Sequence, residues 1–370
     1  MTAATGALAP AAPALLVTRS RRPATWAAAV GVCGLLVLAL LPFVSAIGFI
    51  TDLVNLFILV SLATMWNALA GYVGLVSVGQ QLYIGAGAYL VLVLSQHGWD
   101  PFAAVPVAVV GGAVLALPAS WLVFRLSGAY FAIATWVLAE VGMLFVERFG
   151  SLGGGTGAPV LGLDGFGPDA LLRYTYWLAL GVTALVVLAV FVLLRSRLGL
   201  VLTAVRDNET GARSVGAPVM ASKRVVYLLA AGGCAATGAV IAISQLDVEP
   251  SNVFNVQWTA YMIFAVLIGG LATIEGPLVG AVIFFVLQQE LANYNAWYLI
   301  ILGTVAMAMA IWARRGVWGV LTARLSLHFF PVGYHVHIPG PTAPGDRFSR
   351  FLRGDPPVPP ADPHKEETRA

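Results

Sequence analysis

Very few residues of this chain have the type and the setting that chemistry needs. A P-loop that binds nucleotide requires a lysine directly after a glycine, whereas the two lysines, Lys223 and Lys365, follow serine and histidine. Intramembrane hydrolysis requires a nucleophile with partner groups inside an apolar segment, and His97, the one histidine close to such a segment, lies at its end. We therefore expect neither a P-loop ATPase nor another kind of enzyme.

Glu140 is the clearest ionisable residue within an apolar run. A charged side chain in lipid is costly and persists only where it has a role. The carboxyl group could relay protons or help to line a pathway. Alternatively, it lies near a helix end or binds neighbouring backbone, and the sequence leaves both interpretations open.

Two stretches, residues 71–89 and 269–281, contain glycine and polar residues where lipid would favour leucine. Glycine in a membrane helix either interrupts the helix or lets a neighbouring helix approach closely. The first case is typical of a solute pathway, and the second is plain tight packing.

One hydrophilic segment, residues 195–224, is long compared with the other connections on its side. Within it, residues 203–213 are predicted to form a short helix. Glu209 lies four residues before Arg213 and three after Arg206, which is the spacing at which charged side chains of a helix pair. We expect this segment to have a role of its own and not to serve as a spacer.

Gly216 and Pro218 are expected to end that helix. Its apolar strip consists of Val205, Ala212 and Val215, and it is too thin to hold the helix on lipid. The helix is better suited to dock into a groove of another protein.

The composition identifies the surroundings of these residues as a membrane. Of 370 residues, 59% are hydrophobic and 10% are charged, and the mean hydropathy is +0.87, whereas about a quarter of a soluble domain is charged. No charged residue lies between Asp52 and Asp100, a run too long for one buried helix. Cys33 and Cys234 lie far apart in apolar runs, which favours packing over a disulfide or a metal site. The chain is predicted to be an all-α polytopic membrane protein, and its net charge of +3 indicates no nucleic-acid partner.

Apolar runs that are broken by charges, amides or Pro-Gly clusters predict about ten transmembrane helices. The first run is too long for a cleaved signal peptide, whose apolar part has about 7–15 residues, so we expect it to be retained. The predicted helices cover about residues 26–48, 53–70, 82–96, 101–124, 128–148, 174–194, 225–246, 258–274, 277–292 and 296–313.

The basic residues predict the orientation. If the N-terminus is cytoplasmic, every Lys and Arg except Arg148 and Arg173 lies in a cytoplasmic segment, while the outer loops are mainly acidic. This is the asymmetry of the positive-inside rule. We expect both termini in the cytoplasm and the loops 149–173 and 247–257 outside.

Three regions follow from the composition. Residues 1–24 are rich in Ala and Pro, and residues 316–370 are rich in Pro and mixed charge, so both are predicted to be disordered cytoplasmic segments. Residues 25–315 form the transmembrane domain, with residues 195–224 as its cytoplasmic loop.

Five features follow one another along the chain: the stretch 71–89, residues 126–135 with Ala139 and Glu140, the glycine-rich residues 153–157, the cytoplasmic residues 196–216, and the stretch 269–281. In this order and spacing they resemble the LivM-type permeases of the branched-chain amino acid ABC importer family. The resemblance covers about residues 50–315.

The resemblance implies a transmembrane permease subunit of an ATP-driven importer for branched-chain or other small amino acids, located in the cytoplasmic (inner) membrane. It implies as partners a second related permease subunit, two ABC ATPase subunits that bind the ATP, and an extracytoplasmic solute-binding protein. This chain itself is expected to hold no cofactor. Leu75 and the pair Gln80 and Gln81 stand where the family commonly has Gln and a His-Ala pair. The solute therefore stays open, and close relatives carry urea or short amides.

By the same resemblance, two groups of residues have roles, and no catalytic or metal-ligating residue is expected. Coupling to the ATPase is assigned to Arg206, Asp207, Asn208, Glu209, Ala212, Arg213 and Gly216. The candidate pathway residues are Ser77, Gln80, Gln81, Tyr83, Tyr89, Tyr130, Glu140 and Thr273.

The alternative is a self-contained, ion-driven secondary transporter or a channel for a small polar solute. Such a protein would account for the apolar helices and for Glu140, but it leaves the cytoplasmic segment without a role. An intramembrane enzyme lacks the necessary group of nucleophile and partner residues.

Overall fold

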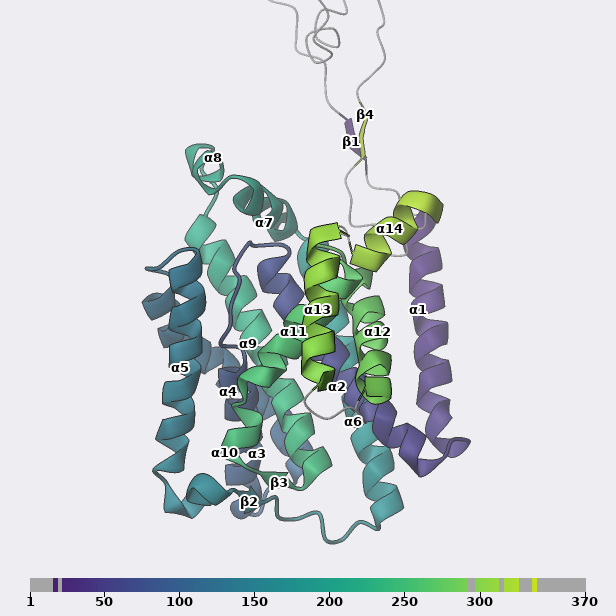
Figure 1. Ribbon diagram of the computed structural model, residues 1–370, viewed down its shortest axis with the longest axis vertical. Helices are drawn as coiled ribbons and strands as arrows, with labels where there is room; N and C mark the ends of the chain where they lie inside the picture. The colour runs from purple at the N-terminus through teal and green to yellow at the C-terminus, as the bar shows by residue number, and fades with distance from the viewer. Residues whose placement is uncertain (1–15, 19–21, 292–296, 313–315, 326–334, 338–370) are drawn as a thin grey trace, which may run out of the picture. The chain divides into compact units, whose positions relative to one another are not determined.

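The computed structural model describes residues 16–18, 22–291, 297–312, 316–325 and 335–337, and it divides into two compact units (Figure 1). One unit holds the strands β1 (Leu16–Thr18) and β4 (His335–His337), which pair antiparallel with Leu16 opposite His337. The other unit, residues 23–332, consists mainly of helices, together with the short antiparallel pair β2 (Ala158–Pro159) and β3 (Asp247–Val248). The all-α prediction is confirmed.

The helices follow the order of the predicted apolar runs. They are α1 (Arg22–Leu40), η1 (Leu41–Phe43), α2 (Ile47–Ala70), α3 (Gln81–Gln96), α4 (Pro101–Val123), α5 (Ala129–Glu147), η2 (Gly150–Leu152), η3 (Gly154–Thr156), α6 (Pro168–Arg195), α7 (Arg197–Asp207), α8 (Glu209–Ser214), α9 (Val219–Gln245), α10 (Pro250–Val253), α11 (Val256–Gly269), α12 (Glu275–Leu291), α13 (Trp297–Trp312) and α14 (Gly316–Leu325).

Each predicted transmembrane range overlaps a helix of the structure. Within the described residues, 6 helical segments are long and apolar enough to cross a membrane, namely α2, α4, α5, α6, α9 and the run from α10 through α11. The helices α3, α12 and α13 are shorter, with 16, 17 and 16 residues. A polytopic membrane protein is therefore confirmed, and the number of membrane crossings stays a prediction.

Helix α9 is the centre of the helical unit. In its most apolar window 83% of the residues are buried, against 17% for α5, which lies at the left edge of this unit in Figure 1. Glycine allows the backbones of α3 and α9 to touch. A Cβ atom added at Gly87 of α3 would lie 2.0 Å from the carbonyl oxygen of Ala235 of α9. A Cβ atom added at Gly238 of α9 would lie 2.0 Å from the carbonyl oxygen of Ile84 of α3. Close contact of small residues is a principal way in which helices associate in lipid.

Segments that were predicted to share a side of the membrane contact one another. At the lower end in Figure 1, β2 pairs with β3, and the amide of Val160 donates to the carbonyl oxygen of Leu246 at 3.0 Å. These contacts join the two loops that we expect outside. The helix α8 lies at the opposite end in Figure 1. Its Glu209 pairs with Lys223 at 2.7 Å, and both residues belong to the predicted cytoplasmic loop. The cytoplasmic position of the two termini stays a prediction.

The prediction of disorder is wrong for residues 316–325, which form α14. Trp318 is buried, and Val317 packs against the core. The chain enters this helix at Gly316, whose φ of +65° is readily adopted by glycine. A Cβ atom added there would lie 2.4 Å from Cα of Gly270, so a larger residue would clash. The composition of residues 316–370 gave the wrong prediction for this helix because the prolines of the tail begin only at Pro331, beyond its end.

The prediction of disorder is also wrong for residues 22–24, which belong to α1, and for the paired residues 16–18 and 335–337. The remainder of the two segments predicted to be disordered lies outside the described residues.

Candidate transport pathway and coupling surface

The chain runs without regular helix through residues 71–80, which we call the interrupted segment, between α2 and α3. The indole of Trp66 donates to the carbonyl oxygen of Ser77 at 2.9 Å, and the amide of Val78 donates to Oγ1 of Thr135 at 3.1 Å. Thr135 lies six residues into α5, or about 9 Å at the rise of an α-helix, so the segment reaches into the membrane region. Irregular backbone is tolerated at that depth only where protein or water satisfies it.

The polar side chains that end the interrupted segment are enclosed by helices of this chain. Ser77, Gln80 and Gln81 are fully buried. The amide of Gln80 donates to Oγ of Ser77 at 3.1 Å and its oxygen accepts from the thiol of Cys234 at 3.5 Å. The oxygen of Gln81 accepts from Thr259, but its Nε2 has no partner within the described residues. The buried thiol thus packs against an amide, and Gln81 holds an unused donor at the start of α3.

Tyr83 and Tyr89 follow on α3 and are buried as well. The hydroxyl of Tyr83 donates to that of Tyr227 on α9 at 2.9 Å. The hydroxyl of Tyr89 finds no partner within the part of the chain that is described. Five of the candidate pathway residues, from Ser77 to Tyr89, therefore lie inside the bundle and do not line an open surface.

Tyr130 and Glu140 lie elsewhere, on α5, where Tyr130 is exposed and Glu140 is half-buried. Tyr130 as a whole residue is 74% exposed. The carboxylate of Glu140 accepts a hydrogen bond from the indole of Trp136, one turn earlier, at 3.0 Å. Glu140 is thus in mid-helix, and a neighbouring side chain, not the backbone, is its hydrogen-bond partner.

Thr273 belongs to the second glycine-rich stretch and has a local role. Its hydroxyl donates to the carbonyl oxygen of Gly270 at 3.1 Å and accepts from the amide of Gly276 at 3.0 Å, at the start of α12. This is the hydrogen bonding of a residue that caps a helix.

Asn67 near the end of α2 is a residue that the sequence analysis missed. Its amide donates to the carbonyl oxygen of Thr273 at 2.8 Å, and its oxygen accepts from the amide of Ala272 at 3.0 Å. Asn67 is buried and clamps the loop before α12 to the point where the interrupted segment begins. The signal that could have found it is an amide within the apolar run of a predicted transmembrane helix.

The predicted cytoplasmic helix over residues 203–213 is wrong in one respect, because two helices, α7 and α8, cover this region. Asn208 separates them in an extended conformation, with φ −157° and ψ 99°. Its side chain accepts from the amide of Gly211 at 2.8 Å and so caps α8. Asparagine competes for backbone hydrogen bonds in this way, which favours a new helix start over continuation.

The apolar strip is also different from the predicted one. Val205, Ala212 and Val219 are buried together and hold α7, α8 and α9 against one another. Val215 is 81% exposed instead. Gly216 follows with a φ of +81°, as expected of the residue that ends the helix.

The charges of this loop form two groups. Glu209 pairs with Arg213 at 2.8 Å, as its spacing predicted, and with Lys223 of α9 at 2.7 Å. Arg206 does not pair with Glu209; it contacts Asp207 at 2.9 Å and donates from Nη1 to the carbonyl oxygen of Gly71 at 3.1 Å. Arg206 therefore joins α7 to the first residue of the interrupted segment.

The hydrogen bond from Lys223, and then that from Arg213, hold the pKa of Glu209 below its ordinary value. A carboxyl pKa that is lowered by folding adds stability above the unfolded pKa, and this stability is lost as the pH falls through the folded pKa. The connection between α8 and α9 is thus intact at neutral pH. Solvent screening reduces what these ion pairs of Glu209 contribute to the stability of the folded state, because the Glu209 side chain is 40% exposed.

Residues 24–310 match the family model described as "Branched-chain amino acid transport system / permease component". The chain is similar to the "High-affinity branched-chain amino acid transport system permease protein LivM" of Escherichia coli K12, with 27% identity over 321 residues that cover 79% of this chain and 75% of the relative. It is also similar to the protein of the same name from Salmonella typhimurium LT2, with 26% identity over an alignment that covers 77% of this chain and 73% of the relative. No solved structure matches.

Proposed function

The chain belongs to the branched-chain amino acid transport permease family and is a permease subunit of an ABC importer in the inner membrane; from this premise we propose its solute, its partners and the way it is driven. The solute is a small amino acid with an aliphatic side chain. The ATP is bound by two separate ATPase subunits, so this chain needs no cofactor and performs no chemistry of its own. An extracytoplasmic binding protein delivers the solute.

The exposed face of α5 supports a second, related permease subunit as a partner. Only 17% of its apolar window is buried by this chain, and Glu140 lies on this poorly covered helix. A carboxylate in mid-helix is costly against lipid and is tolerated where protein or a water-filled path covers it. We therefore assign Tyr130 and Glu140 to the face that meets the second permease, with the solute path between the two subunits.

Replacing Glu140 with Gln is expected to reduce solute uptake about tenfold or more at an unchanged protein level. Gln retains an oxygen that can accept from Trp136 but carries no charge. A partner in the solute path that binds the charged carboxylate would lose about 1.5 kcal/mol or more, which corresponds to about tenfold. Uptake of labelled leucine by cells with the complete transporter measures the effect. Glu147→Gln at the end of the same helix is the control and should transport normally. Full activity of Glu140→Gln would show that the charge is dispensable.

The connection from Arg206 to Gly71 is the observation that carries the coupling proposal. The exposed end of α8 at Val215 docks into the ATPase, and movement of α7 and α8 pulls on the interrupted segment through the Arg206 guanidinium. In this proposal the coupling unit consists of Arg206, Asp207, Asn208, Glu209, Ala212, Arg213 and Gly216. Its shape is held by Asn208, Glu209 and Ala212. Charge for contact with the ATPase is offered by Asp207 and Arg213.

The buried polar residues of the interrupted segment complete the proposal. Ser77, Gln80 and Gln81 are enclosed in the present structure, and Thr273 caps α12 beside the Asn67 clamp. A shift of residues 71–80 would turn these groups, with Tyr83 and Tyr89 behind them, toward the path along α5. Gln81 suits this role because its Nε2 donor is unused within the described chain.

Depleting ATP while the proton gradient is maintained is expected to stop uptake within the time needed to empty the ATP pool. The alternative function, a secondary transporter or channel, takes its energy from a gradient and would continue. Labelled leucine uptake in whole cells distinguishes the two, and a proton-driven carrier in the same cells serves as the control for the gradient. Continued uptake without ATP would overturn the proposed function.

A further inference from the structure

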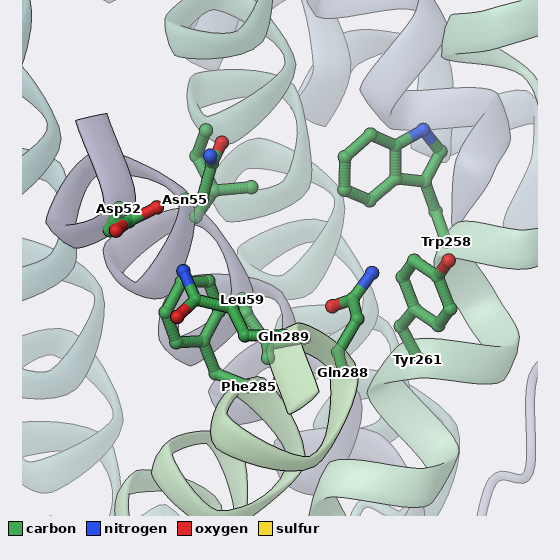
Figure 2. A pocket seen from close by; sticks show the side chains of 9 residues that line it. Asp52, Asn55, Leu59, Trp258, Tyr261, Phe285, Gln288 and Gln289 are labelled. Atoms are coloured by element: carbon green, nitrogen blue, oxygen red, sulfur yellow. The ribbon is translucent and has the colours of Figure 1, made fainter. Parts of the chain in front are cut away.

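An open hollow of about 340 Å³ lies where α2, α11 and α12 meet, away from the interrupted segment (Figure 2). Small-molecule sites begin at about this size. The side chains that line it are Asp52, Asn55, Ile58, Leu59, Trp258, Tyr261, Phe285, Gln288 and Gln289.

The direction of the helices divides these residues into a polar rim and an apolar floor. Asp52 and Asn55 lie in the first turns of α2, and Gln288 and Gln289 lie in the last turn of α12, so all four are near the same end of the bundle. Ile58 and Leu59 lie deeper along α2, and Phe285 lies deeper along α12. The loop before α11 belongs to the β3 side, which the charge distribution assigns to the outside.

The rim is not used by the chain itself. Within the described ranges, the side chains of Asp52, Asn55, Gln288 and Gln289 have neither a hydrogen bond nor an ion pair. Figure 2 shows the Gln288 and Gln289 amides between the α2 carboxylate on one side and the Trp258 and Tyr261 rings on the other. No Lys or Arg is among the lining residues.

This arrangement selects the chemistry of a ligand. The Asp52 carboxylate attracts an ammonium group through charge. The Trp258 and Tyr261 rings, on the far side of the amides, add apolar surface to the hollow. Amide NH₂ groups can donate to a carboxylate of the same ligand. The floor of Ile58, Leu59 and Phe285 accommodates an aliphatic group.

We propose that this hollow is an outer reception site for a small amino acid with an aliphatic side chain, with its ammonium group on Asp52, its carboxylate on the Gln288 amide and its side chain on the floor, while Asn55 and Gln289 flank the bound molecule. The choice of an amino acid rests on the proposed function. The site is separate from the α5 face and from the coupling unit, so it can fail while both of those assignments stand.

The test uses the full chain in its complete transporter, with single cysteines at Asn55 and Gln289 in a Cys33→Ser background; the remaining Cys234 is buried. An impermeant thiol reagent is added from outside. L-leucine is expected to slow labelling at both positions, and isoamylamine, which lacks the carboxylate, should do so at higher concentration. 4-Methylpentanoate, which is leucine without the amine, should give no protection.

Asp52→Asn should raise the leucine concentration for half-maximal protection at least about tenfold. Asp169→Asn, an exposed outer carboxylate in the first turn of α6, is the matched control and should leave it unchanged. The two cysteine reporters lie on different helices, at Asn55 of α2 and Gln289 of α12. If one reporter variant misfolds, protection of the other cysteine still tests the site.

Labelling that leucine does not slow, or protection that Asp52→Asn leaves unchanged, would overturn the reception site. If leucine uptake is ATP-dependent in the same cells, that result leaves the proposed function intact. Protection without any leucine uptake would support the hollow and contradict the proposed solute.

Discussion

Replacing Val215 with Asp is expected to abolish co-purification of the ATPase while the permease folds and inserts normally. Val215 is 81% exposed and lies outside the small core of Val205, Ala212 and Val219, so the chain itself loses no packing. In the docked complex the new carboxylate would be buried without a partner, at about 3–5 kcal/mol, or a loss of about a hundredfold or more in affinity. Affinity purification of the tagged permease measures the bound ATPase.

Arg206→Ala is expected to separate docking from transmission. Its side chain contacts Asp207 and Gly71 and contributes nothing to the exposed end of α8, so the ATPase should remain bound. The connection to the interrupted segment is lost, and we expect ATP hydrolysis that no longer responds to the solute. ATPase activity of the reconstituted complex, with and without loaded binding protein, measures this response.

Leu161→Asp is the control for both variants. Leu161 is also exposed, but it lies beside β2 in a loop predicted to be outside, where no ATPase can reach. It should retain both the bound ATPase and stimulated hydrolysis. If Val215→Asp also retains both, the α7–α8 segment is a spacer, and the coupling proposal loses its basis.

Asn67→Leu is expected to yield little folded protein. Leucine has a similar volume, but it leaves the amide of Ala272 and the carbonyl oxygen of Thr273, both only partly buried, without their partner. An unpaired group that is fully buried costs about 1–3 kcal/mol, so the total for these two partly buried groups is at most about 2–6 kcal/mol, against a stability of about 5–15 kcal/mol. The yield of monodisperse protein and the thermal midpoint in detergent measure the loss.

Thr64→Val is the matched control on the same helix. Thr64 is equally buried, but among the described residues its hydroxyl bonds only to the carbonyl oxygen of Val60 within α2. That carbonyl keeps its helical hydrogen bond when the hydroxyl is removed, so a change below about 1 kcal/mol is expected. Equal losses for the two variants would mean that the Asn67 clamp adds nothing beyond packing.

The sequence was sufficient for features that depend on neighbours in the chain. Helical apolar runs, the pairing of Glu209 with Arg213 and the left-handed backbone at Gly216 each follow from a few consecutive residues. The predicted single helix over residues 203–213 failed because Asn208 offered its own side chain to the backbone of the next turn. The predicted disorder of residues 316–325 was wrong because α14 buries Trp318 and packs Val317 against the core, and this burial outweighs the composition of the tail.

The sequence alone determined that this is an all-α membrane protein with a long charged loop and a carboxylate in the middle of an apolar helix, because lipid imposes length and polarity on every segment separately. Only the tertiary structure decided which polar groups are enclosed and which remain available. The Asn67 clamp spans more than two hundred residues, and the hollow at Asp52 needs three helices from distant parts of the chain. Such contacts depend on how helices pack against one another, and packing between distant segments leaves no periodic signal in the sequence.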